Sequence, residues 1–63
     1  MPIAFLHILK GRKEGTKKQL IKEVNEAIVR NLNVDSEKVR IILQEVEKEN
    51  WAVAGLTKAD SEN

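Results

Sequence analysis

The first hydrophobic run of the chain predicts a strand. Residues 3–9, IAFLHIL, are apolar except for His7. A run of this length is too short for a stable buried helix. It also lacks the alternation of apolar and polar residues that is typical of a strand with one solvent-exposed face. We therefore expect a strand covered on both faces, which Gly11 ends.

The next segment has the period of a helix. In residues 13–33, KEGTKKQLIKEVNEAIVRNLN, apolar side chains recur at spacings of three, four and seven, as one stripe of an amphipathic helix requires. The sequence TKKQ fits a capping box in which the Thr16 hydroxyl caps the Gln19 N–H. Gly15 leaves open a start one turn earlier, near Lys13.

A second strand is predicted at residues 39–46, VRIILQEV. Val39, Ile41 and Leu43 alternate there with a mixed face that begins at Arg40. A strand, a helix and a strand form a βαβ unit, whose crossover makes the two strands parallel. Two strands and one helix leave the far face of the sheet uncovered. The remaining apolar residues, Ile42 among them, then need a partner chain to bury them.

The C-terminal segment predicts a short hairpin arm and then a tail. In NWAVAG, residues 50–55, Trp51 and Val53 alternate with small side chains, which favours a short strand or one arm of a hairpin. Composition turns polar after Gly55, so we expect residues 56–63 to form a flexible tail. The prediction is one α+β domain spanning residues 1–63.

Composition narrows the function classes. A 63-residue chain is too short to bury a large core, and without cysteine it has no disulfides to stabilise the fold. We therefore expect self-association to supply the missing stability. Eleven basic and ten acidic side chains give a net charge of +1, too balanced for an electrostatic nucleic-acid partner. The apolar opening lacks the flanks of a signal peptide and the length of a membrane span. We therefore expect a cytoplasmic protein without nucleic-acid or membrane partners.

Four residues carry candidate chemistry: Pro2, Arg12, Arg40 and Trp51. Once Met1 is removed, the Pro2 nitrogen is a free secondary amine that could serve as a base. Each residue also has a plain structural interpretation. Proline is tolerated at the start of a strand, arginine is usually solvated, and tryptophan is more often a core or interface anchor than the wall of a site.

Together these residues resemble a known pattern. The stretches PIAFLHILKGR, KKQLIKEVNEAI, VRIILQEV and NWAVAG are similar to the 4-oxalocrotonate tautomerase family across nearly the whole chain to Gly55. The resemblance implies a homohexamer, a trimer of dimers, of βαβ protomers. It also implies a cofactor-independent isomerase that interconverts enol and keto forms of 2-hydroxydienoates and related 2-oxo acids, with no bound metal.

The resemblance assigns a role to each site residue. Pro2 is the general base, and Arg40 binds the carboxylate and enol oxygen beside the reacting carbons. Arg12 holds the distal carboxylate of a dicarboxylate, Trp51 walls the site, and the backbone of Leu9 lies near the ligand. The groups come from more than one chain in this family, so the site exists only in the oligomer. His7 matches a histidine away from the chemistry, for which we expect a structural role.

Two alternatives stay open at this point. A hydratase or dehalogenase on the same scaffold needs a carboxylate to activate water, and Glu47 and Glu49 are the candidates near Trp51. A non-catalytic oligomeric protein would follow if Met1 were retained, because the Pro2 nitrogen would then be an amide without basicity.

Overall fold

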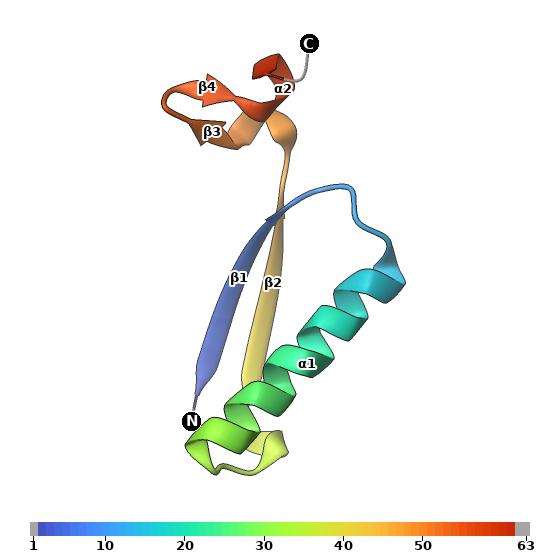
Figure 1. Cartoon of the computed structure of the whole chain (residues 1–63), viewed down its shortest axis with the longest axis vertical. Helices are drawn as coiled ribbons and strands as arrows, with labels where there is room; N and C mark the ends of the chain where they lie inside the picture. Colours follow the sequence, from blue (N-terminus) through green and yellow to red (C-terminus); the bar gives the residue numbers. More distant parts are fainter. Residues whose placement is uncertain (1, 62–63) are drawn as a thin grey trace.

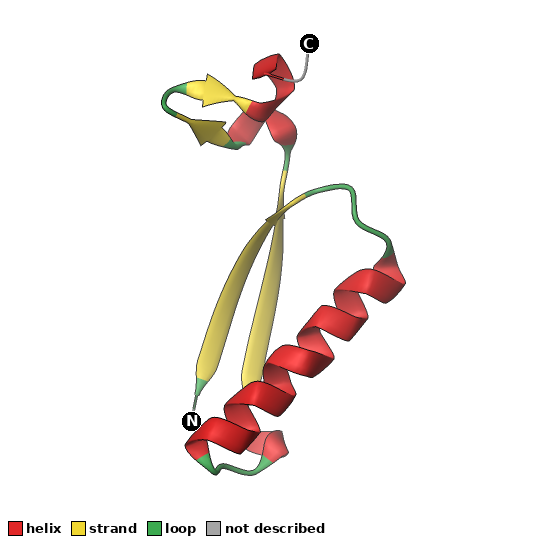
Figure 2. Ribbon diagram, in the orientation of Figure 1, coloured by secondary structure: helices red, strands yellow, loops and turns green. Residues whose placement is uncertain are grey.

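A two-stranded sheet and one long helix form the body of the molecule, of which the computed structural model describes residues 2–61. Figures 1 and 2 show the helix lying diagonally across one face of the sheet, with a small arm beyond the far end of the strands. The elements in chain order are β1 (Ile3–Leu9), α1 (Glu14–Leu32), the 3-10 turn η1 (Ser36–Lys38), β2 (Arg40–Val46), the 3-10 turn η2 (Lys48–Asn50), β3 (Ala52–Val53), β4 (Leu56–Thr57) and α2 (Lys58–Ser61).

Strands β1 and β2 pair in parallel over their full length. The register places Ile3 opposite Arg40 and Leu9 opposite Val46. Both strands therefore begin at the same edge of the molecule and end at the opposite edge. This confirms the predicted βαβ unit with parallel strands and one crossover helix.

Helix α1 begins before the predicted capping box. Its N-cap is Lys13, with no side-chain cap, and the Lys17 N–H donates to the Lys13 carbonyl at 3.1 Å. The Thr16 cap is therefore wrong and the earlier start is right, since the Gln19 side chain instead donates to Glu23 at 2.9 Å. At the other end, Asn33 ends the helix in the left-handed conformation. Neither helix among residues 2–61 is long and apolar enough to cross a membrane.

The two faces of the sheet differ in exposure. Along each strand half-buried positions alternate with exposed ones, and α1 covers only one face. The other face carries Ile3, Phe5 and Ile42, of which Phe5 is 62 % exposed. No side chain in residues 2–61 is fully buried. The expected covering of β1 on both faces is thus absent from the single chain, as a two-stranded sheet with one helix requires.

The C-terminal arm is a hairpin followed by a helical turn. β3 and β4 are antiparallel, and the two loop residues between them, Ala54 and Gly55, both have positive φ, 55° and 84°. Positive φ at both positions is what a two-residue hairpin turn with the twist of its strands needs. Residues 56–61, where composition predicts a flexible tail, have regular structure: Thr57 pairs with Ala52, and its hydroxyl accepts the Asp60 N–H at 3.2 Å. The flexibility of the tail stays a prediction, and residues 62–63 lie outside the described range.

The hairpin turn gives a testable prediction. Gly55→Ala places a Cβ at φ 84° and should lower the free energy of unfolding by about 1–2 kcal/mol. Ala54→Gly, the matched change at the neighbouring left-handed position, should not lower it. Thermal unfolding at one fixed chain concentration measures both variants. Equal behaviour of the two would contradict the assigned turn.

Candidate active site

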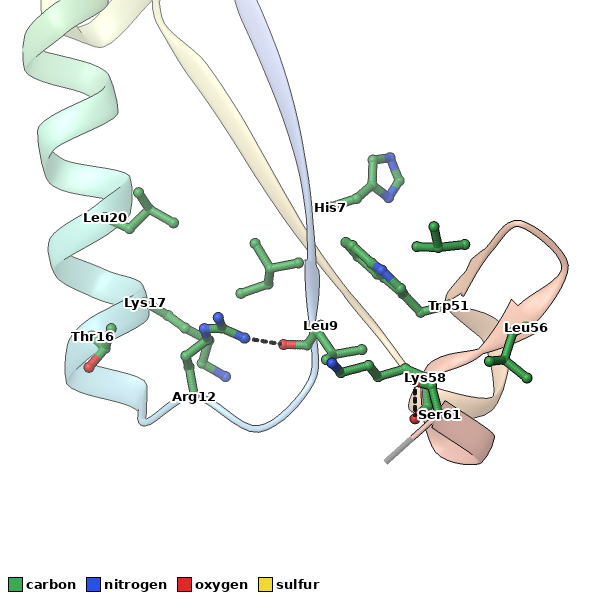
Figure 3. Close-up of a pocket in the computed structure, with 12 residues that line it drawn as sticks. His7, Leu9, Arg12, Thr16, Lys17, Leu20, Trp51, Leu56, Lys58 and Ser61 are labelled. Atoms are coloured by element: carbon green, nitrogen blue, oxygen red, sulfur yellow. Dashed lines mark hydrogen bonds between the residues drawn. The ribbon is translucent and has the colours of Figure 1, made fainter. Parts of the chain in front are cut away.

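A cavity of about 750 Å³ lies where β1 ends, between the first turns of α1 and the C-terminal arm. Each of the three parts contributes side chains, as Figure 3 shows. β1 supplies His7 and Leu9, the loop and α1 supply Arg12 and Lys17, and the arm supplies Trp51 and Lys58. The cavity therefore depends on segments far apart in the sequence.

Arg12 faces this cavity from the turn after β1. Gly11, at φ 130°, lets the chain turn there, and the Arg12 guanidinium reaches back to donate to the Leu9 carbonyl at 3.3 Å. That acceptor is neutral, so it orients the guanidinium without cancelling its charge. Arg12 forms no ion pair with any carboxylate of residues 2–61.

Two carboxylates at the end of the sheet next to the cavity are paired with lysines. Glu45 of β2 forms an ion pair with Lys17 of α1, and each side chain is only 25 % exposed. Glu47 accepts a hydrogen bond from Lys10 at 2.9 Å. This hydrogen bond, together with the Glu47 charge, raises the pKa of Lys10 above its usual value. Neither Glu45 nor Glu47 is therefore a partner of Arg12.

Trp51 is fixed at the base of the arm. Its N–H closes η2 by donating to the Lys48 carbonyl at 3.4 Å, and its own carbonyl accepts the Lys58 N–H at 2.7 Å. The half-buried indole lies beside the His7 ring in Figure 3, on the cavity side of β1. His7, for which the sequence predicts a role away from the chemistry, therefore also lines this cavity.

Pro2 and Arg40 lie together at the opposite end of the sheet. The Arg40 N–H donates to the Pro2 carbonyl at 3.1 Å, because the parallel strands begin side by side. The Arg40 guanidinium donates to the Glu37 carbonyl at 2.8 Å and to the Val39 carbonyl at 3.3 Å. Like Arg12, it has neutral acceptors and no carboxylate partner within residues 2–61.

The five predicted site residues therefore fall into two groups. Leu9, Arg12 and Trp51 share the cavity, while Pro2 and Arg40 share the far edge. The seven residues of β1 lie between them, a separation of roughly 20 Å at about 3.3 Å per residue. A single chain therefore does not bring the two groups together.

Within residues 2–61, no three or more side chains that could bind a metal ion lie close together.

Among the cavity residues that the sequence did not predict, Lys58 is a cation without an ion pair in residues 2–61. Its ammonium side chain lines the cavity from the start of α2, in the segment for which polar composition predicts a flexible tail. The available signal was the hairpin itself. A turn at Ala54 and Gly55 folds the following strand back along β3. Lys58, which follows that strand, is thereby placed beside Trp51.

Comparison with known proteins places the chain in a family. Residues 2–61 match the family described as tautomerase enzyme. A 2-hydroxymuconate tautomerase from Pseudomonas putida is 46% identical over 55 residues, 87% of each chain. A probable tautomerase from Listeria monocytogenes is 37% identical over 60 residues, which are 95% of this chain and 98% of that protein.

Solved structures agree with this placement. A 4-oxalocrotonate tautomerase isozyme from Methylibium petroleiphilum superposes with a TM-score of 0.94 at 36% identity, covering 97% of this chain and 95% of that one. A heterohexamer 4-oxalocrotonate tautomerase from Chloroflexus aurantiacus has a TM-score of 0.91 at 30% identity, covering 95% and 97%. The chain belongs to the tautomerase family, whose named members are isomerase-type enzymes.

Proposed function

We propose that the chain is a cofactor-independent tautomerase that interconverts enol and keto forms of a 2-hydroxydienoate or a related 2-oxo acid. The observation that carries this proposal is a pair of arginines that have no carboxylate partner within residues 2–61. Arg12 and Trp51 line one cavity, and Arg40 lies beside Pro2. The first group suits the distal end of an anionic substrate, and the second suits its reacting end.

The proposed reaction moves one proton and needs no other reactant. After Met1 removal the Pro2 nitrogen takes the proton of the enol hydroxyl. The same nitrogen returns that proton to a carbon of the conjugated system, which leaves the keto form. Arg40 binds the carboxylate and the enol oxygen, where negative charge develops. Arg12 holds the distal carboxylate through its planar fork, which can contact both oxygens.

The base must be unprotonated near neutral pH. A free α-amine has a pKa of roughly 8 and is mostly protonated there. A cation within contact distance disfavours the protonated amine by roughly 4 kcal/mol at an effective dielectric near 20. Because about 1.4 kcal/mol corresponds to one pKa unit, this repulsion is large enough to lower the pKa of the amine below about 7. Arg40 beside the Pro2 amine, in a site that Trp51 shields from water, is therefore sufficient to keep the amine unprotonated near neutral pH.

We infer that the complete site forms between chains. Pro2 and Arg12 lie at opposite ends of β1, so a second copy must supply the cavity group beside the Pro2 of the first. The exposed apolar face with Ile3, Phe5 and Ile42 offers a surface for this association. A homohexamer, a trimer of dimers, is the proposed assembly, and the Chloroflexus relative is itself named a heterohexamer.

The alternatives receive less support. A hydratase or dehalogenase needs a free carboxylate, and Glu47 near Trp51 is bound to Lys10. Glu49, the other candidate, is exposed and does not line the cavity. A non-catalytic role depends on the state of Met1, which lies outside the described residues. Cytoplasmic location stays a prediction.

Removal of Met1 gives the test of the mechanism. Processed and Met1-retaining preparations should be assayed on 2-hydroxymuconate across pH by the loss of ultraviolet absorbance. The processed form should gain rate with rising pH, because the unprotonated amine is active, through an apparent pKa below that of an ordinary terminal amine. The Met1-retaining form should be about 10²- to 10⁴-fold slower, the usual general-base contribution. Equal rates would remove Pro2 from the mechanism.

The exposed sheet face gives the test of assembly. Sedimentation at micromolar concentration should give the mass of six chains. Phe5→Glu should dissociate the assembly, because burying a large apolar side chain contributes about 1.5–3 kcal/mol per chain and a buried carboxylate costs more. Lys18→Glu, on the exposed surface of α1, is the matched charge control and should leave the mass unchanged. A folded wild-type monomer would contradict the proposed assembly.

A further inference from the structure

Lys58 is a half-buried cation in the cavity that the proposed roles do not use. Its backbone is fixed by the 2.7 Å hydrogen bond to the Trp51 carbonyl, so it is held by the same residue that walls the cavity. In Figure 3 its side chain runs from α2 along the cavity toward the end of β1 at Leu9. The ammonium group has no hydrogen-bond or ion-pair partner among residues 2–61.

The cavity holds two positive charges that no carboxylate of residues 2–61 compensates. Its lining includes Arg12, Lys17 and Lys58 and, within the described part of the chain, no acidic side chain. Lys17 is neutralised by Glu45. The acidic residue nearest in sequence to Lys58, Asp60, does not line the cavity. Within residues 2–61, Arg12 and Lys58 therefore both lack a carboxylate partner, which a bound anion would supply.

We propose that Lys58 is a second anion-binding residue of this site, which together with Arg12 binds the distal carboxylate of a dicarboxylate substrate. The inference rests on the proposed function and adds a specificity-determining residue to it. The Arg12 fork sets the orientation of the carboxylate, and the lysine adds a point charge with little geometric demand. A monocarboxylate has no distal charge to receive this attraction. The pair thus favours dicarboxylates over monocarboxylates by binding the former more tightly.

Kinetics of a Lys58 variant separate this role from a structural one. Lys58→Gln should raise KM for 2-hydroxymuconate, a dicarboxylate enol, by roughly three- to tenfold, as expected for the loss of one partly exposed ion pair. It should leave kcat unchanged, and it should leave KM unchanged for phenylenolpyruvate, a monocarboxylate enol. Lys58→Arg should restore the low KM. Lys18→Gln, an exposed lysine outside the cavity, is the control.

A binding measurement tests the same claim without turnover. Trp51 is the only tryptophan of the chain and lines the cavity, so its fluorescence reports occupancy. The probes are adipate and hexanoate, which have six carbons each and differ in the distal carboxylate. Wild type should bind adipate more tightly than hexanoate. Lys58→Gln should reduce that preference by roughly three- to tenfold, and added salt should weaken it further.

The outcomes are distinguishable. An unchanged adipate preference in Lys58→Gln, or an equal rise in KM for both enols, would overturn the role of Lys58. If wild type turns over neither enol, the proposed function fails. The adipate and hexanoate comparison then still decides whether Lys58 binds a distal carboxylate.

Discussion

Parallel pairing of β1 with β2 determines where every functional group of this chain lies. Because both strands run in the same direction, their first residues meet at one edge of the sheet and their last residues at the other. Pro2 and Arg40 are thereby neighbours, joined by a backbone hydrogen bond of 3.1 Å. The turn after β1 and the arm after β2 likewise emerge at one end, where they enclose the cavity.

The same topology leaves the chain incomplete. One crossover helix covers one face of two strands, so Phe5 and Ile42 remain 62 % and 44 % exposed. A chain with no fully buried side chain in its described part gains little of the apolar burial that stabilises a domain. In the proposed assembly, stability and catalysis have one cause: the contact that covers the sheet also brings the cavity of one copy to the Pro2 edge of another.

Local pattern was enough to predict the strands, the helix and the crossover, because their periods and the shortness of the chain leave few topologies. The helix start was harder. Thr16 and Gln19 have the right spacing for a cap, but backbone bonding begins a turn earlier at Lys13 and leaves Gln19 free to bond Glu23. Composition alone could not predict that Lys58 is held in place, since the bonds that hold it come from the hairpin and from the Trp51 carbonyl.

The division of the site follows from topology as well. Arg12 follows the first strand and Arg40 begins the second, so the parallel pairing that the βαβ pattern predicts places the two arginines at opposite ends of the sheet. In the proposed assembly, each site therefore combines opposite ends of different chains. A chain with a mutation at one end and a chain with a mutation at the other should then repair each other in a mixed assembly.

Complementation between two defective chains measures this directly. Arg12→Ala and Arg40→Ala chains, each weakly active alone on a low concentration of dicarboxylate enol, are unfolded together, refolded and assayed. Wild type carried through the same cycle is the control. Random assortment gives about a quarter of the sites both arginines, since each arginine comes from a different chain. We expect recovery of about that fraction of wild-type activity. A mixture no more active than the average of its two components would contradict it.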